Sequence, residues 1–264
     1  LNLKLAFKEN INSFTNQLDF KCEVENIKKF KGLNSNMNNI VIPDVIEYIT
    51  KQHDNIIIMN FIEGITLRQL DDFDKEKYCK IVTNFGLKSI LFDGYFHSDL
   101  HQGNILFIKN ELDENDNNGN KKIEYKIGIL DFGIIGMITR EDQNYFYNFL
   151  KFCLNKESMK AAEYFIENMI VNDNNLLNEE NVNELIDNIN NLIRRDFVIN
   201  KKVTQKFLYD LNSLLFSKKI KIKIFFTRMQ LALAIVEVIV NSLSNSNKSF
   251  LDYSHDLINA TCLI

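Results

Sequence analysis

The chain has 264 residues, of which 45% are hydrophobic and 25% charged, and its formal net charge is −4 at pH 7. This length and composition fit a globular protein with one large domain or two lobes. Basic and acidic residues are interspersed, so we expect no nucleic-acid partner. The four cysteines lack a Cys-x-x-Cys pair and are expected to be ordinary thiols rather than disulfide or zinc ligands.

The two ends of the chain carry little targeting information. The sequence begins with Leu1 instead of methionine, so we interpret it as part of a longer or processed protein whose targeting segment would precede it. The longest apolar run, residues 231–240, contains Glu237 and is shorter than the roughly 20 residues that span a bilayer. We therefore expect no transmembrane helix.

The spacing of apolar residues predicts a first helix over residues 3–31, where they recur at intervals of three and four. Asp19, Glu23 and Asn26 share another face of this helix. Taken alone, such a polar face is expected to contact solvent.

Two strands are predicted next, over residues 40–49 and 55–61. The second strand continues into a link that ends at Gly64. This passage resembles the hinge between two kinase lobes, where main-chain groups would meet an adenine base. Taken alone, it is a strand followed by a turn.

The middle of the chain is predicted to contain a helix over residues 73–92 and strands over residues 105–108 and 123–130. The acidic, asparagine-rich segment 111–122 is expected to be an expanded hairpin loop between these strands. It lacks the ligand spacing and the flanking helices of an EF-hand, so we do not expect a calcium site.

The C-terminal half reads as a series of helices, and the whole chain is therefore assigned to the α+β class. Thr139 followed by Asp142 is typical of a helix start. The predicted helices cover residues 140–154, 158–169, 179–196, 204–216 and 224–243.

Two short motifs indicate what reaction this protein catalyses. Residues 97–104 have the form His-x-Asp-Leu-x-x-x-Asn, and an apolar strand ends in the Asp-Phe-Gly of residues 131–133. In kinase-like folds the loop aspartate positions or deprotonates the attacking hydroxyl, and the asparagine and second aspartate hold Mg²⁺. Either motif alone is weak, but together they predict Asp99 as catalytic residue and Asn104 and Asp131 as ligands of Mg²⁺ and nucleotide.

The sequence also restricts the substrate. Protein kinases follow Asp-Phe-Gly with an activation segment that ends in Ala-Pro-Glu. The only proline of this chain, Pro43, precedes both motifs, and a helix is predicted a few residues after Gly136. This favours a small-molecule kinase or an ATPase-like relative over a kinase of proteins.

Three stretches together resemble the UbiB-like atypical kinases, the "activity of bc-one" proteins linked to ubiquinone synthesis. They are the catalytic loop 96–104, the segment 130–136 and, upstream, Gln-Leu-Asp-Phe-Lys-Cys-Glu-Val-Glu-Asn at residues 17–26. The upstream stretch is the specific one, because aminoglycoside and choline kinase-like enzymes share the loop pattern. The resemblance extends from Phe14 to about Leu251.

The resemblance implies a protein-kinase-like bilobal fold. Residues 1–64 would form a truncated N-lobe with helix, two strands and hinge, and residues 65–264 a mostly helical C-lobe. It also implies binding of Mg²⁺ and ATP, with slow ATP hydrolysis or phosphoryl transfer that supports synthesis or handling of ubiquinone or another prenyl lipid. Implied partners are ATP, prenyl-lipid or quinone-biosynthesis proteins and a membrane surface. The expected location is the mitochondrial inner-membrane face, with plastid and bacterial cytoplasm as alternatives.

Carried over residue by residue, the family pattern gives Asp99, Asn104 and Asp131 the roles stated above. Glu23 matches the helix glutamate that pairs with the nucleotide-binding lysine, and Asp19 matches the acid of the family's Glu-x-Asp motif. The helix face that these two residues share with Asn26 would therefore look onto the nucleotide cleft instead of solvent.

The sequence departs from the family pattern at Gln17, which replaces the first glutamate of Glu-x-Asp, and at Gln102, which replaces a proline. The family's alanine-rich nucleotide loop, phosphate-binding lysine and Lys-x-Gly-Gln extension precede the first helix and have no match here. We therefore expect weak or no activity from these 264 residues alone and activity from a longer parent protein.

Two alternatives stay open. A small-molecule kinase of the aminoglycoside or choline type would phosphorylate a small alcohol, although residues 17–26 weigh against it. A pseudokinase scaffold would bind lipid or protein partners without catalysis, and Gln17 gives it some weight. Nucleotide binding by an upstream-extended protein would distinguish the scaffold from both enzymes.

Overall fold

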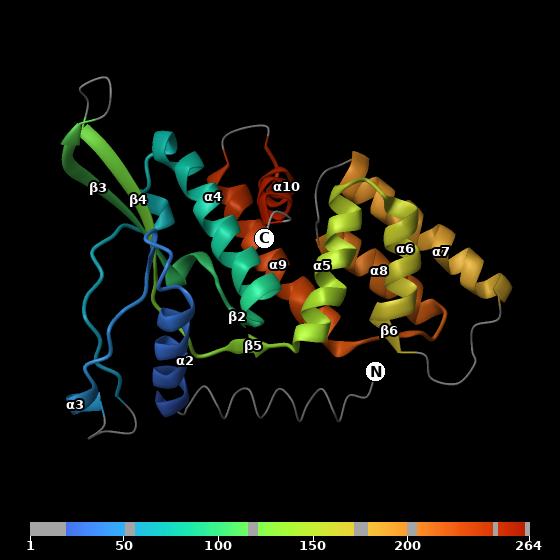
Figure 1. Cartoon of the computed structure of the whole chain (residues 1–264), viewed down its shortest axis with the longest axis horizontal. Helices are drawn as coiled ribbons and strands as arrows, with labels where there is room; N and C mark the ends of the chain where they lie inside the picture. The colour runs from blue at the N-terminus through green and yellow to red at the C-terminus, as the bar shows by residue number, and fades with distance from the viewer. Residues whose placement is uncertain are drawn as a thin grey trace. The chain divides into compact units, whose positions relative to one another are not determined.

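The structure is a computed structural model that describes residues 20–50, 56–115, 121–171, 179–199, 205–244 and 248–261. It confirms the mixed α+β class, and its residues group into two compact units (Figure 1). Unit 1 contains the described residues up to Ile81 together with His97–Gly136, and unit 2 contains Val82–Phe96 and the residues from Met137 onward. The predicted division into lobes at residue 64 stays a prediction.

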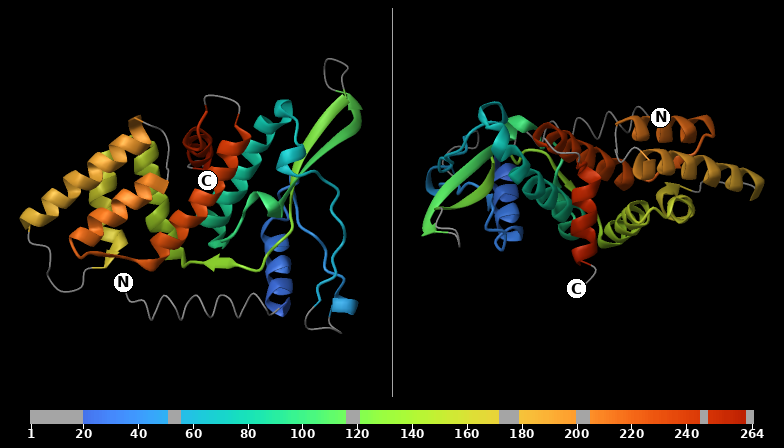
Figure 2. Two further views of the ribbon diagram at one scale, coloured as in Figure 1. Left: turned by 180° about the vertical axis from the view of Figure 1, so that it is seen from behind. Right: turned by 90° about the horizontal axis from the view of Figure 1, so that it is seen from above.

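The sheet of unit 1 has three strands in the order β1-β4-β3, with β1 at Ile40–Val41, β3 at Ile105–Asn115 and β4 at Lys121–Ile129. The central strand β4 runs parallel to β1 and antiparallel to β3. Both views in Figure 2 show β3 and β4 as one long hairpin. Ile127 and Ile129 of β4 are fully buried, so this end of the hairpin belongs to the core.

The prediction of a loop over residues 111–122 is wrong for those residues of the segment that the structure describes. Glu111 pairs with Ile123 and Asn115 with Lys121, so both strands continue beyond the expected ends, with an irregularity in register between them. Main-chain hydrogen bonds alone can extend a ladder, so a polar sequence does not prevent a strand from continuing. Residues 116–120 lie outside the described part of the chain.

Helix α2 spans Phe20–Leu33 and ends two residues after the first helix predicted from sequence. Ile27 and Phe30 are its buried residues and anchor it in unit 1. The predicted portion before Phe20, which includes Gln17 and Asp19, lies outside the described residues.

The two strands predicted over residues 40–49 and 55–61 are mostly not regular strands. Only β1 is regular, and the first segment ends in a short helix, α3, at Glu47–Thr50. The segments meet at one antiparallel bridge between Val45 and Met59. Pro43 has no N–H to donate, which limits the pairing beyond β1.

Helix α4 spans Asp72–Lys88, and a wider helical turn at Ser89–Asp93 continues it to Gly94, as predicted from the spacing. Gly94 has a φ of 62°, and an added Cβ there would lie 2.9 Å from Cδ of Gln143. Glycine is therefore required for the chain to turn into β2 at Tyr95–His97. Strand β2 pairs with β5 at Ile135–Met137 in a two-stranded sheet.

Unit 2 is mainly helical, and the predicted helices of the C-terminal half are confirmed with small changes at their ends. Figures 1 and 2 show α5, α6, α7 and α8 packed side by side. Thr139 and Asp142 form the expected capping box of α5. The elements are α5 (Arg140–Leu154), α6 (Ser158–Met169), β6 (Ile170–Val171), α7 (Glu179–Ile193), α8 (Gln205–Ser217), β7 (Lys221–Ile222), α9 (Ile224–Leu243) and α10 (Phe250–Thr261).

Aromatic side chains fill the core of unit 2. Phe149, Phe165 and Phe226 lie with their ring centroids 5.0–5.7 Å apart, and Phe146 packs against Phe226 at 5.6 Å. The rings of Phe226 meet the others edge to face, the arrangement that aromatic quadrupoles favour. This cluster joins α5, α6 and α9.

Helix α9 is the part of the described chain that has the length and composition of a membrane span, with a mean hydropathy of 1.6 in its most apolar window. The expectation that this region is too short is wrong, because the helix begins at Ile224 and has 20 residues. However, 56% of that window is buried within the protein, as in the core helix of a globular domain. Length and composition alone are therefore weak support for a membrane-spanning role.

Gly86 allows α4 to approach α9 closely. A Cβ added at Gly86 would lie 2.6 and 2.9 Å from the two γ-carbons of Val236.

We expect Gly86→Ala to destabilise the fold by about 1–3 kcal/mol, since overpacking exceeds the roughly 1 kcal/mol that alanine gains in a helix. Denaturant unfolding would measure this. Val236→Ala should relieve the clash, so full additivity of the two substitutions would contradict this explanation.

Asp74 of α4 stabilises unit 1 in a pH-dependent way. Its carboxylate is 14% exposed and accepts hydrogen bonds from Lys109 Nζ at 2.7 Å and from the Tyr125 hydroxyl at 2.9 Å. Burial alone would raise the pKa of Asp74, but these bonds outweigh it and hold the pKa below its ordinary value of 3.8. Its stabilisation is therefore present above the unfolded pKa and lost as the pH falls through the folded pKa.

We therefore expect Asp74→Asn to lower the free energy of unfolding by about 1 kcal/mol at pH 7. The difference from the parent chain should shrink as the pH falls below 3.8. Denaturant unfolding at several pH values would measure it. A difference that stays constant down to pH 2 would show that the charge of Asp74 is not the cause.

Candidate active site

Strand pairing in unit 1 places the two predicted metal ligands side by side. Asn104 immediately precedes β3, Asp131 follows β4 by two residues, and Ile105 pairs with Ile129. The Leu130 N–H donates to the Asn104 carbonyl at 3.0 Å, which extends the ladder toward the site. As a result, Asn104 Nδ2 lies 3.3 Å from Asp131 Oδ2.

Asn104 also holds the loop that carries the predicted catalytic residue. Its Nδ2 donates to the main-chain carbonyl of Asp99 at 3.3 Å, and the His101 N–H donates to the same carbonyl at 2.9 Å. The side chain of Asp99 is exposed and forms no hydrogen bond or ion pair with the described residues. Its main chain is therefore fixed while its carboxylate stays accessible to a substrate.

His97 connects this loop to Asp131. Its ring is 5% exposed, and Nδ1 accepts the Asp99 N–H at 3.0 Å. Nε2 lies 2.6 Å from the Asp131 carbonyl oxygen, which can only accept, so Nε2 carries the proton. Burial lowers the pKa of His97, although the bond to Asp131 and the nearby carboxylates oppose this. The neutral ring thus holds both predicted aspartates through their main chain.

The Asp-Phe-Gly segment is folded back on itself, with Phe132 buried and its two neighbours partly exposed. Asp131 Oδ1 accepts the Gly133 N–H at 2.8 Å, and the Ser98 N–H donates to the Ile134 carbonyl at 2.9 Å. The ring of Phe132 is fully buried, with its centroid 5.2 Å from that of Phe30 and 6.1 Å from that of His97. Phe132 therefore packs the segment between α2 and the catalytic loop.

Helix α2 contributes two polar side chains to this segment. Glu23 Oε1 accepts the Phe132 N–H at 3.3 Å, and Asn26 Nδ2 donates to the Phe132 carbonyl at 2.8 Å. Burial raises the pKa of Glu23, the bond from Phe132 opposes this, and the charge of Asp131 raises it further. The polar face of α2 thus contacts protein, and the solvent-facing alternative is wrong for these two residues.

Of the predicted site residues, Glu23, Asp99, Asn104 and Asp131 all lie in unit 1 and are joined by the hydrogen bonds above. Asp19 lies outside the described residues, and the pairing of Glu23 with a lysine stays a prediction. Asn26 was not among the predicted site residues. Its position three residues after Glu23, on the same helical face, was the signal that could have identified it.

The oxygen atoms at the site suit a hard cation. Asn104 uses its amide nitrogen for both bonds, which leaves Oδ1 available beside the carboxylate of Asp131. Mg²⁺ is commonly held by one or two such protein oxygens together with phosphate and water. Within the described ranges, no three His, Cys, Asp or Glu side chains cluster as they would at a zinc site. The residues therefore fit Mg²⁺ bound jointly with a phosphate-containing ligand.

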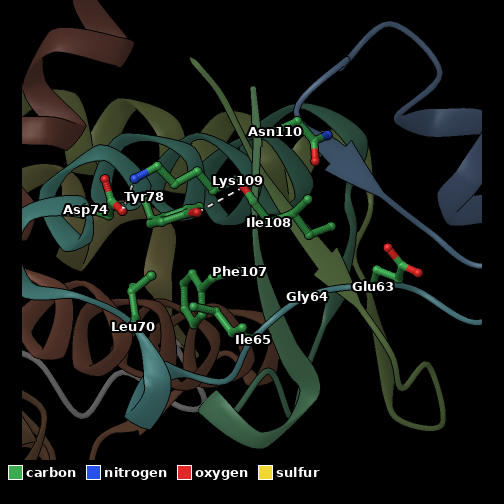
Figure 3. A pocket seen from close by; sticks show the side chains of 10 residues that line it. All are labelled: Glu63, Gly64, Ile65, Leu70, Asp74, Tyr78, Phe107, Ile108, Lys109 and Asn110. Atoms are coloured by element: carbon green, nitrogen blue, oxygen red, sulfur yellow. Dashed lines mark hydrogen bonds and ion pairs between the residues drawn. The ribbon is translucent and has the colours of Figure 1, made fainter. Parts of the chain in front are cut away.

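Unit 1 also has a cavity of about 270 Å³ that shares no residue with this site (Figure 3). It is bordered by Gly64, Leu70 and the side of β3 that carries Phe107 and Lys109. Tyr78 and Phe107 in its wall are 0% and 1% exposed and pack against each other at 5.0 Å. These rings already contact protein, and the accessible lining of the cavity is more apolar than polar.

The family model of the ABC1 atypical kinase-like domain matches residues 2–165, more than half of the chain. The chain therefore belongs to the ABC1 atypical kinase-like family, which confirms the UbiB-like resemblance. At the level of the family it is a kinase-like protein.

Curated relatives agree with this family. An uncharacterized protein from the hydrogenase 1 5′ region of Clostridium pasteurianum is 29% identical over 283 residues, which cover 97% of this chain and 48% of that protein. The probable protein kinase UbiB of Shewanella woodyi is 30% identical over 157 residues, 57% of this chain and 26% of that protein. The chain thus spans about half the length of the first relative and about a quarter of the second.

A solved structure supports the kinase-like fold. The complex of Rv3197 with erythromycin from Mycobacterium tuberculosis matches with a TM-score of 0.54 and 14% identity, covering 89% of this chain and 57% of that chain. At this identity the likeness concerns the fold alone.

Substitution of His97 tests whether its ring holds the main chain of Asp99 and of Asp131. We expect His97→Phe to keep the ring packing but to leave the Asp99 N–H and Asp131 carbonyl without their partner, destabilising the fold by about 1–3 kcal/mol. Thermal or denaturant unfolding measures this. His101→Phe is the matched control, because His101 is exposed and accepts only the nearby Gly103 N–H. Equal effects of the two substitutions would contradict the assigned role of His97.

Proposed function

We propose that this chain carries the catalytic part of an atypical kinase that binds Mg²⁺ and ATP and hydrolyses ATP slowly or transfers its terminal phosphoryl group. The observation that carries this proposal is the double hydrogen bond of Asn104, which joins the Asp99 main chain to the Asp131 carboxylate. Phosphoryl transfer in kinase-like folds needs these three side chains at one site. The family membership supports the same class of reaction.

In this proposal each residue has a separate task. The exposed carboxylate of Asp99 orients the attacking hydroxyl or water and accepts its proton. Asn104 Oδ1 and the carboxylate of Asp131 hold Mg²⁺, which when bound neutralises charge on the phosphates. His97 keeps the two loops at a fixed separation through its ring nitrogens. Asp19, if it follows the family pattern, lies at the same nucleotide.

A small molecule is the favoured phosphoryl acceptor. Only the short strand β5 and a turn separate Gly133 from α5, which begins at Arg140. A peptide substrate would need a longer platform at this point. Transfer to a small alcohol is therefore the second candidate function, and a phosphorylated product from a panel of small alcohols would support it.

We further propose that the longer protein acts on ubiquinone or a related prenyl lipid at a membrane, in the mitochondrion or alternatively in a plastid or a bacterial cytoplasm. The connection to quinones comes from the resemblance to UbiB-like kinases, and a curated relative named as a probable protein kinase UbiB matches 57% of this chain. Exposed Ile224, Leu231 and Val238 form an apolar stripe on α9, and Lys221 and Lys223 lie beside its start. Such a stripe beside basic residues supports peripheral membrane contact. Its binding to anionic vesicles would test this.

Thermal unfolding with Mg²⁺ and ATP tests the central proposal. A ligand at about 100 times its dissociation constant stabilises a protein by about 2.7 kcal/mol, a readily measured shift. We expect this shift in a protein extended upstream of these residues and in its Asp99→Asn variant, but not in its Asp131→Ala variant. Asp99→Asn should instead lower the rate of ATP hydrolysis by a factor of roughly 10²–10⁴, the amount that a positioned acid or base contributes.

Glu25→Gln is a suitable control for both variants, because Glu25 is exposed on α2. A protein that shows no shift with Mg²⁺ and ATP would favour the non-catalytic scaffold. Unchanged hydrolysis in Asp99→Asn would exclude Asp99 as the catalytic residue while leaving nucleotide binding intact.

A further inference from the structure

We infer that Asn26 is a positioning residue that sets the Mg²⁺ affinity of the site by holding Asp131 through the main chain of Phe132. This inference rests on the proposed function, because it assigns Asn26 a task at the same Mg²⁺ site. The amide of Asn26 donates to the main-chain carbonyl of Phe132, the residue that follows Asp131.

One face of α2 contacts a single residue of the Asp-Phe-Gly segment at three points. Glu23 accepts the Phe132 N–H, Asn26 donates to the Phe132 carbonyl, and Phe30 packs on the Phe132 ring. The three side chains are spaced at i, i+3 and i+7, which places them in line along one side of a helix. The position of α2 is thereby transmitted directly to Phe132.

The hydrogen bonds fix two successive peptide units. In the first, the Asp131 carbonyl accepts from His97 at 2.6 Å and the Phe132 N–H donates to Glu23 at 3.3 Å. In the second, the Phe132 carbonyl accepts from Asn26 at 2.8 Å and the Gly133 N–H donates to Asp131 Oδ1 at 2.8 Å. All four main-chain polar groups thus have a side-chain partner.

This arrangement determines where the carboxylate of Asp131 points. Oδ1 is held by the N–H of the second peptide unit, and that unit is held in turn by Asn26. Rotation of the second unit would withdraw the Gly133 N–H from Oδ1, so the carboxylate would lose its fixed direction. The bond from Asn26 opposes this rotation.

Substitution of Asn26 tests the geometry of the site without changing its charge, whereas substitution of Glu23 would change both. Glu23 is acidic, and the charge of nearby Asp131 contributes to the raised pKa of Glu23. Substitution of Glu23 would therefore change both the electric field and the geometry at the site. Asn26 is neutral, and Asn26→Leu removes the amide donor while keeping a side chain of similar size. A change in Mg²⁺ affinity in this variant therefore reports on the position of Asp131.

The test is a Mg²⁺ titration of ATP binding in the parent chain, Asn26→Leu, Asn26→Ala and the control Glu25→Gln. We expect the Mg²⁺ concentration for half-maximal binding to rise about three- to tenfold in both Asn26 variants, the size of one lost hydrogen bond. At saturating Mg²⁺ the ATP affinity should return to that of the parent. A purely structural role would weaken ATP binding at every Mg²⁺ concentration, and that result would overturn the inference.

A second measurement needs no nucleotide. Hydrogen exchange of the Gly133 amide in the ligand-free chain should be faster in Asn26→Leu and Asn26→Ala and unchanged in Glu25→Gln. Unchanged exchange in the Asn26 variants would overturn the inference whether or not ATP binds. If exchange rises as expected but the parent chain shows no Mg²⁺-dependent ATP binding, the proposed function fails and the role of Asn26 in Mg²⁺ affinity fails with it.

Discussion

The hydrogen bonds of His97 are the constraint on which the candidate active site depends. One ring nitrogen accepts the Asp99 N–H and the other donates to the Asp131 carbonyl, so a single buried side chain sets the separation of two loops. This works only with the neutral tautomer protonated at Nε2, and burial favours that state by lowering the pKa of His97. The hairpin of β3 and β4 then fixes Asn104 against Asp131 from the opposite side.

Neutral donors hold two acidic side chains of the site, Glu23 and Asp131. Glu23 accepts a main-chain N–H, Asp131 accepts the Gly133 N–H and the Asn104 amide, and the carboxylate of Asp99 stays exposed. Hydrogen bonds of this kind orient a carboxylate without cancelling its charge. Negative charge therefore stays available to attract a divalent cation, while burial and, to a smaller extent, the charge of Asp131 raise the pKa of Glu23.

The sequence predicted the parts of the molecule whose pattern is local. The helices of unit 2 follow from apolar spacing, and the Asp99, Asn104 and Asp131 motifs lie where strand pairing brings their ends together. Non-local features escaped prediction. Val45 pairs with Met59 through a single bridge, and Glu111 continues a ladder although its segment is polar. Helical spacing places Asn26 on the same face as Glu23, but its partner Phe132 lies 106 residues away, and no local pattern identifies that partner.

The contacts of α2 explain why one face of this helix is polar. A solvent-facing stripe would place Glu23 and Asn26 in water at no cost, whereas here burial of Glu23 is unfavourable and must be offset by the bond it accepts. Phe132 offers both a main-chain N–H and a main-chain carbonyl to α2. Glu23 accepts from the N–H and Asn26, about one helical turn further along, donates to the carbonyl. Since Phe30 adds an apolar contact to the same residue, any displacement of α2 would act on all three contacts together. The orientation of Asp131 is therefore tied to the position of α2 rather than to its own loop alone.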